Sequence, residues 1–175
     1  MNKFINPADV IAQTGLHNGQ IVADMGCGGG FYAIPAAKIV GPSGLIYAVD
    51  IQESKLAFTQ SIAHQLGYTN IDTVQANLEQ QVNEVPDASC DLVITASILH
   101  EIPHREPVFT NAYRALKTDG KLLVVEWIQG FTLFGPPQEK RIAKEAMEAE
   151  VIKLGFKKKQ DISADTFHYA MVFTK

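Results

Sequence analysis

The sequence contains little of what would mark several other classes of protein. Its two cysteines, Cys27 and Cys90, are too few for a disulfide framework or a cysteine-rich metal cluster, so we predict no metal site. No apolar run approaches the roughly 18 residues that a membrane-spanning helix needs. Basic residues are not in excess, because the net charge is −4, so composition gives no electrostatic reason to expect a nucleic-acid partner.

Targeting signals, internal repeats and low-complexity segments are also missing from the sequence. The first residues hold an early lysine and then Asp9, where the apolar part of a secretory signal would lie. Together with the small number of cysteines, this favours a cytoplasmic protein that makes no membrane contact. With 175 residues, of which 46% are hydrophobic, the chain can bury a proper core, and we expect one domain over residues 1–175.

Glycines stand at the alternate positions 26, 28 and 30, and also at position 29, in the stretch Gly26–Gly30, which we call the glycine turn. The apolar run before it, Ile21–Met25, is typical of a strand buried on both faces, and residues 31–40 after it are expected to form a helix. Such a turn lets a ligand touch the main chain, and free N–H groups at a helix start attract anions. Asp24 adds a carboxylate, which is useful when the ligand also carries a cation. The stretch therefore predicts a site for a nucleotide cofactor of mixed charge.

The rest of the chain alternates between expected strands and helices and ends in a hairpin. Further strands are expected at 45–50, 70–75, 91–95 and 121–127, helices at 7–13, 52–65, 108–117 and 138–154, and the hairpin strands at 157–162 and 166–174. Strands separated by helices form parallel sheets, whereas a hairpin is antiparallel. The expected fold is α/β: a Rossmann-like open sheet of about seven strands, mostly parallel with an antiparallel C-terminal hairpin, and helices on both faces.

An acidic residue also follows the second expected strand. Asp50 lies twenty positions after Gly30, and its two oxygens can accept hydrogen bonds from both hydroxyls of a ribose. Any adenosine cofactor would use such a residue. The pattern Gly28-x-Gly30-x-x-Ala33 also matches the loose dinucleotide fingerprint, so an NAD(P)-dependent oxidoreductase is an alternative. The terminal hairpin and Asp24 favour methyl transfer over hydride transfer.

Four segments, in this order along the chain, resemble motifs of class I S-adenosylmethionine-dependent methyltransferases of the small type 11/25-like kind. The first is the Asp-x-Gly-x-Gly-x-Gly pattern of residues 24–30. The second is Gln75–Glu79, the third is Pro86–Val93, which leads into the fourth strand, and the fourth is Ala115–Leu122, which turns into the fifth. Cys90 replaces an aromatic residue of the third motif, and Thr118 and Asp119 replace Pro and Gly in the last.

The resemblance implies S-adenosylmethionine as the cofactor, with S-adenosylhomocysteine as the product. The residues that it implies for cofactor binding are Asp24, Gly26, Cys27, Gly28, Phe31, Asp50, Ile51, Asn77, Leu78 and Thr95. Ile51 takes the place of the residue that packs on the adenine face. Asn77 is expected to meet the adenine amino group, and Glu79 is the alternative.

Candidates for a general base cluster after the fourth expected strand, at His100, Glu101 and His104. This position is the usual crevice of an open α/β sheet. A base is needed only when the methyl acceptor carries a proton at working pH, so the alternative is that these residues cap and orient a short helix. Glu126, at the end of the fifth expected strand, points towards the same crevice.

The acceptor is expected to be a small molecule. Adenine-amine and glutamine methylators carry Asn/Asp-Pro-Pro-aromatic after the fourth strand, where this chain has Thr95–Ile98, and arsenite methylation needs more than two thiols. The apolar loop Gly130–Pro137 is expected to cover the acceptor pocket with Phe131, Leu133 and Phe134, or else to pack as core or as a dimer contact. A homodimer and a non-catalytic cofactor-binding module both stay open.

Overall fold

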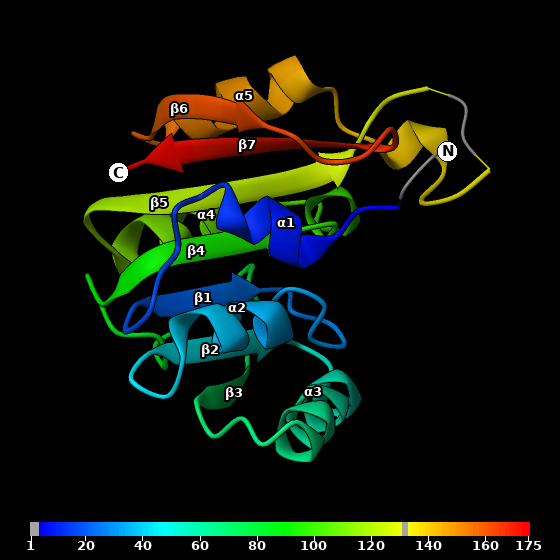
Figure 1. Cartoon of the computed structure of the whole chain (residues 1–175). Coiled ribbons are helices and arrows are strands. Elements are labelled where there is room, and N and C mark those ends of the chain that lie inside the picture. The colour runs from blue at the N-terminus through cyan, green and yellow to red at the C-terminus, as the bar shows by residue number, and fades with distance from the viewer. Residues whose placement is uncertain (1–3, 131–132) are drawn as a thin grey trace.

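The computed structural model describes residues 4–130 and 133–175, and a seven-stranded sheet with the order β3-β2-β1-β4-β5-β7-β6 forms its centre (Figure 1). The strands are β1 Ile21–Met25, β2 Leu45–Asp50, β3 Ile71–Gln75, β4 Cys90–Ala96, β5 Leu116–Trp127, β6 Lys157–Ile162 and β7 His168–Thr174. The helices are α1 Pro7–Ala12, α2 Ala33–Val40, α3 Glu53–Gln65, α4 Glu106–Ala115 and α5 Lys144–Lys153, with short 3₁₀ turns η1 Leu99–Glu101 and η2 Gln138–Lys140.

Strands β1 to β5 run parallel, and β7 is antiparallel to both β5 and β6. The predicted fold class is therefore confirmed. The carboxyl ends of the parallel strands meet at one edge, which we call the carboxyl edge. Because β7 runs the other way, it starts at that edge, with His168 paired to Trp127 at the end of β5. The turn between β6 and β7 lies there as well.

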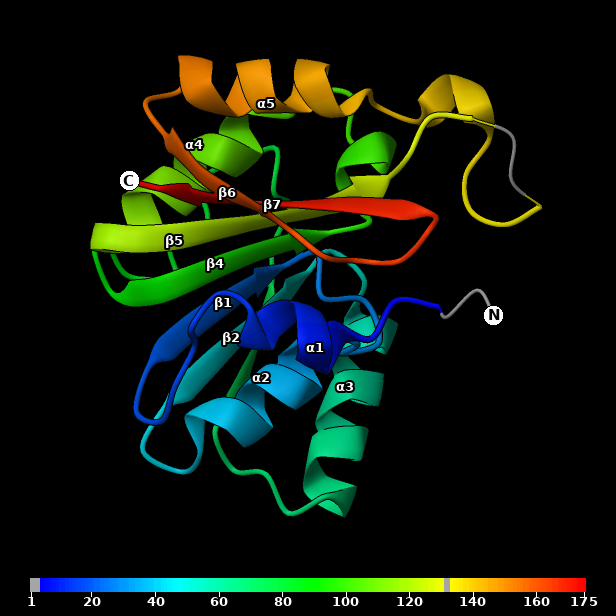
Figure 2. The same ribbon diagram turned by 45° about the horizontal axis from the view of Figure 1, so that its top comes forward.

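Helices cover both faces of the sheet (Figure 2). On one face, α1 and α2 bury Val10, Ile11 and Ala33 against alternate residues of the strands, such as Val22 and Ile46. On the other face, α4 and α5 bury Val108, Phe109, Met147 and Val151. Strand residues that are apolar at every position can supply both cores, as a parallel sheet requires. Within the described ranges, no helix has both the length and the apolar character that a membrane crossing demands.

The expected helix over 138–154 is wrong in its first part. Residues 138–140 form the 3₁₀ turn η2, the backbone is extended at Arg141 and Ala143, and α5 begins only at Lys144. The physical reason is Arg141, which is 5% exposed and donates to backbone carbonyls of the preceding loop. A helical backbone at this position would carry the guanidinium away from those carbonyls. The helix expected from residue 31 also starts later, at Ala33.

Candidate functional site

The glycine turn is fixed at the carboxyl edge by backbone contacts. The N–H groups of Gly26 and Cys27 both donate to the carbonyl of Val49, at 2.8 and 2.9 Å. Gly26 has a φ of +83°, and a Cβ there would lie 2.6 Å from Cγ1 of Ile98. Only glycine combines this backbone angle with so close a neighbour. The residue type at position 26 is therefore set by the shape of the turn.

Gly28 faces open space. No described atom lies within 4 Å of the place where its Cβ would stand. Its N–H donates to Oδ2 of Asp50 at 2.9 Å, and its carbonyl accepts from the Thr59 hydroxyl at 3.0 Å. The main chain is thus held in place while one side of Gly28 stays accessible, as a turn that cradles a ligand requires.

Asp24 is 2% exposed, and its Oδ2 atom has no hydrogen-bond partner among the residues that the structure describes. Burial raises the pKa of this carboxyl to about 7; the N–H of Ala33 lowers it, and the charge of Asp50 raises it further. A buried polar atom without a partner costs free energy unless a ligand supplies one. The atom therefore fits a cofactor that brings a cationic group to the glycine turn.

Asp50 is 6% exposed and bridges β2 to the glycine turn. Its Oδ2 accepts from Gly28, and its Oδ1 accepts from the N–H of Gln52 at 2.9 Å. Each carboxylate oxygen can accept more than one hydrogen bond, so ribose hydroxyls can still be bound. Ile51 and Phe31 are 58% and 77% exposed, which leaves apolar surface on both flanks of the turn.

The segment after β3 is held by an asparagine of α4. Asn111 is 3% exposed, and its amide donates to the carbonyls of Leu78 and Gln80 and accepts from the N–H of Val82. Leu78 is 6% exposed, which fits the wall of a pocket. Asn77 closes a local turn, because its Oδ1 accepts from the N–H of Glu79 at 2.9 Å.

Two of the residues predicted for cofactor binding turn their side chains into the protein. Thr95 is fully buried, and its hydroxyl donates to the carbonyl of Leu123 on the neighbouring strand at 3.4 Å. Cys27 is 5% exposed, and burial followed by the charges of Asp24 and Asp50 raises the pKa of its thiol. We therefore keep Thr95 out of the proposed site and assign Cys27 a backbone role.

The structure pairs His100 of η1 with Glu126 of β5. The Nδ1 atom of His100 lies 3.1 and 3.0 Å from the two carboxylate oxygens of Glu126, whose side chain is fully buried. The carboxylate also accepts from the backbone N–H groups of His100 and Trp127. Because a carboxylate only accepts, Nδ1 carries the hydrogen, and Nε2 is left as the atom that can take a proton.

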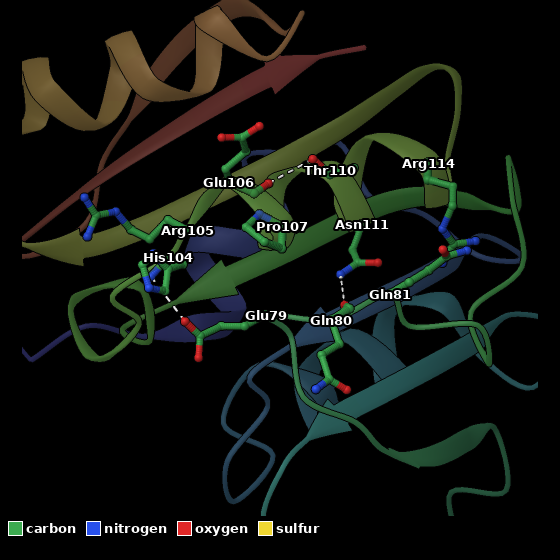
Figure 3. Close-up of a pocket in the computed structure, with 10 residues that line it drawn as sticks. All are labelled: Glu79, Gln80, Gln81, His104, Arg105, Glu106, Pro107, Thr110, Asn111 and Arg114. Carbon is green, nitrogen blue, oxygen red and sulfur yellow. Dashed lines mark hydrogen bonds between the residues drawn. The ribbon is translucent and has the colours of Figure 1, made fainter.

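The other two candidates for a base lie in different surroundings. Glu101 is exposed, and its Oε1 stands 3.8 Å from Nε2 of His100. His104 lines a groove of about 580 Å³ between α4 and the segment after β3 (Figure 3). There the backbone N–H of His104 donates to Oε1 of Glu79 at 3.2 Å, so the alternative adenine contact, Glu79, is engaged with this groove.

The apolar loop Gly130–Pro137 is largely exposed in its described part. Leu133 and Phe134 are 83% and 50% exposed, and Phe131 lies outside the described residues. Phe134 packs edge-on against Phe4 and Phe167, with ring centroids 5.5 and 6.1 Å apart. We call Phe4, Phe134 and Phe167 the aromatic cluster. Figures 1 and 2 agree that the loop, the segment before α1 and the β6–β7 turn all lie at the carboxyl edge.

Sequence reasoning missed several residues that shape the site. The sequence pattern does not single out Thr59, Asn111 or Tyr32, and it does not pair Glu126 with His100. Each lies far along the chain from the group that it contacts or sits inside an ordinary helix pattern. The signal that could have paired Glu126 with His100 is its acid character at the end of an otherwise apolar strand, at the crevice where His100 is expected.

Comparisons with known proteins agree with this geometry. The profile of the family described as "Methyltransferase domain" matches residues 16–166. The ubiquinone/menaquinone biosynthesis C-methyltransferase UbiE of Pseudoalteromonas translucida is 35% identical over 67% of this chain and 46% of its own length. The UbiE of Pseudomonas entomophila is 32% identical over 77% of this chain and 49% of its own length. A crystal structure of a SAM-dependent methyltransferase from Aquifex aeolicus superposes with a TM-score of 0.90 at 23% identity, covering 98% of this chain and 90% of that one.

The fold and the glycine-turn site define a class I S-adenosylmethionine-dependent methyltransferase. The chain belongs to the methyltransferase-domain family, and its cofactor is S-adenosylmethionine. The predicted class and cofactor are therefore confirmed. The chain spans just under half the length of the two UbiE relatives named above.

Proposed function

We propose that this methyltransferase transfers a methyl group to a small-molecule acceptor that must lose a proton, by in-line displacement at the carboxyl edge. When bound, S-adenosylmethionine supplies a methyl group that its sulfonium has already activated. The protein then has to align the acceptor with that methyl group and exclude water. The observation that carries the proposal is the pair of His100 and the fully buried Glu126, in the crevice where an acceptor would lie.

The proposed cofactor site is built around the glycine turn. Gly26 and Cys27 hold the turn in shape through their N–H groups. The open side of Gly28 and the Asp24 carboxylate face the amino-acid end, and Asp50 accepts hydrogen bonds from the ribose. Exposed Ile51 and Phe31 and the buried Leu78 offer apolar surface, with Ile51 and Leu78 beside the adenine. The Asn77 amide reads the adenine edge, and Asn111 holds that segment in place.

His100 is the proposed general base, and Glu126 positions it. The buried carboxylate fixes both the orientation of the ring and the hydrogen on Nδ1, so that Nε2 can accept the acceptor's proton. Glu101 lies close enough to Nε2 of His100 to assist the transfer of that proton or to relay it. His104 and Glu79 both line the groove of Figure 3, and the lining of that groove includes no residue of the glycine turn.

The aromatic cluster suggests the chemical character of the acceptor. Phe4 and Phe134 expose 65% and 50% of their surface at the edge where the acceptor would enter. An apolar ring or chain would remove this surface from water, at roughly 25 cal/mol per Å² buried. The relatives named for ubiquinone and menaquinone biosynthesis agree with an apolar acceptor. We therefore propose a weakly acidic, apolar small molecule as the substrate class.

The test is methyl transfer from labelled S-adenosylmethionine to a panel of phenols, thiols and amines. We expect turnover with weakly acidic apolar acceptors, and a loss of roughly 100- to 10,000-fold in His100→Gln with unchanged binding of S-adenosylhomocysteine. Glu126→Gln should lower turnover and change the pH profile, because the ring loses its orientation. His104→Gln is the matched control, and Glu101→Gln should lower turnover less than His100→Gln, because Glu101 acts only through Nε2 of His100. If either variant loses as much turnover as His100→Gln, the base is misassigned, and cofactor binding without transfer to any acceptor would favour a binding module.

A further inference from the structure

Three buried side-chain oxygen atoms in the described part of the chain have no hydrogen-bond partner. Among the residues that the structure describes, they are Oδ2 of Asp24, the Tyr32 hydroxyl and Oδ2 of Asp165. Asp24 and Tyr32 are 2% and 7% exposed, and the side chain of Asp165 is 2% exposed. Buried oxygens of this kind are rare in folded proteins, because water is not there to replace the missing partner.

The three residues come from two parts of the chain that meet at the carboxyl edge, where Ala164, next to Asp165, packs against the apolar cluster that contains Tyr32. Asp24 lies in β1, Tyr32 precedes α2 at the end of the glycine turn, and Asp165 lies in the turn between β6 and β7. That turn is tied to α1 by Gln13 and Ser163, whose groups exchange two hydrogen bonds of 2.8 and 2.9 Å. The electrostatics agree, because the charges of Asp24 and Asp165, after burial, both raise the pKa of the Tyr32 hydroxyl.

The carboxylate of Asp165 is held so that only one of its oxygens is available. Its Oδ1 accepts from the N–H of Phe167 and from both the N–H and Nδ1 of His168, at 2.8 to 2.9 Å. These bonds lower the pKa of Asp165 against the opposing effect of burial, so the group is ionised. His168 is its one basic ion-pair partner within residues 4–130 and 133–175, and Asp24 has none there.

We propose that Tyr32 and Asp165 join Asp24 in binding the ammonium group of the cofactor's amino-acid end. An ammonium carries three N–H donors and a positive charge, which matches two carboxylate oxygens and one hydroxyl oxygen. The proposal rests on the cofactor site described under the proposed function. It gives the C-terminal hairpin a part in cofactor recognition, since Asp165 reaches the site from the β6–β7 turn.

Calorimetric titration with two ligands tests this assignment. S-adenosylhomocysteine carries the ammonium, whereas 5′-methylthioadenosine keeps the adenosine and the thioether but lacks the amino-acid end. Asp165→Asn keeps an oxygen for the three donors and replaces only Oδ2. We expect this variant and Tyr32→Phe to weaken S-adenosylhomocysteine by about tenfold or more, with 5′-methylthioadenosine unchanged within about twofold. Asp161→Asn, on the same hairpin and half-exposed, is the control and should change neither affinity.

Equal weakening of both ligands would show that the two residues only support the fold, and it would overturn the proposal. Unchanged affinity for S-adenosylhomocysteine in both variants would overturn it as well. The melting temperature of each variant without ligand identifies one that fails to fold, and Tyr32→Phe then decides alone. Wild-type protein that binds neither ligand would contradict the cofactor site itself, so that failure is distinct from failure of this proposal.

Discussion

Asp24 is the single residue whose chemistry depends most on its surroundings. Burial raises the pKa of its carboxyl from the usual 3.8 to about 7, so the folded protein holds a proton that the unfolded chain has lost between those values. Over that range the contribution of Asp24 to stability therefore falls as pH rises. A cationic ligand opposes this fall in stability with rising pH, because it favours the ionised carboxylate.

We predict that affinity for S-adenosylhomocysteine rises about tenfold between pH 6 and pH 8 in the wild-type protein, because the ionised fraction of Asp24 rises by that factor around a pKa of about 7. In Asp24→Asn the affinity should be lower and nearly independent of pH. Calorimetry at four pH values measures both. A slope that persists in Asp24→Asn would assign the titration to another group.

At the scale of elements, the segment from the end of β5 to the start of α5 is organised by Arg141. Its Nε donates to the carbonyl of Pro136 at 2.9 Å, Nη1 to Gly130 at 3.0 Å and Nη2 to Phe134 at 2.7 Å. Its guanidinium also lies 5.7 Å from the centre of the Trp127 ring. The base of the loop is therefore fixed, and opening of the whole segment would break several charge-assisted hydrogen bonds.

Replacing Arg141 should therefore destabilise the protein. We predict that Arg141→Ala lowers the free energy of unfolding by about 2 kcal/mol or more, since it removes hydrogen bonds from a buried charged group. Arg141→Lys should restore little of this, because an ammonium lacks the planar fork that reaches several carbonyls. Urea denaturation gives the values, with the exposed neighbour Lys140→Ala as control. A loss no larger than that of Lys140→Ala would show that the loop is held by other contacts.

The elements that sequence predicted well are those with local causes. Apolar runs and glycines placed β1, β2 and the glycine turn, and Asn6 and Pro7 placed the start of α1, where the Asn6 side chain accepts from Ala8. The prediction of a helix from residue 138 is wrong. It relies on the pattern of Glu, Lys and Ala, which favours helix locally, but α5 begins only at Lys144. The contacts of Arg141 with a loop several residues earlier override that preference.

At the scale of the whole molecule, the site depends on contacts between distant segments. His100 and Glu126 are 26 residues apart, and the turn of the last hairpin, which holds Asp165, lies at the same carboxyl edge as the glycine turn. The order of strands sets these contacts, because it decides which strand ends become neighbours. Motifs could therefore predict the cofactor and the glycine turn, whereas the partner of His100 and the burial of the Tyr32 hydroxyl, unpartnered within the described residues, required the three-dimensional structure.

The measurement that tests the account most directly is calorimetric titration of the full chain with S-adenosylhomocysteine and, separately, with NAD. We predict one site for S-adenosylhomocysteine and no binding of NAD, because Asp24 and the glycine turn suit a ligand with a cationic end. At a hundredfold excess over its dissociation constant, S-adenosylhomocysteine should also stabilise the fold by about 2.7 kcal/mol. Binding of NAD without binding of S-adenosylhomocysteine would contradict the assignment of this site.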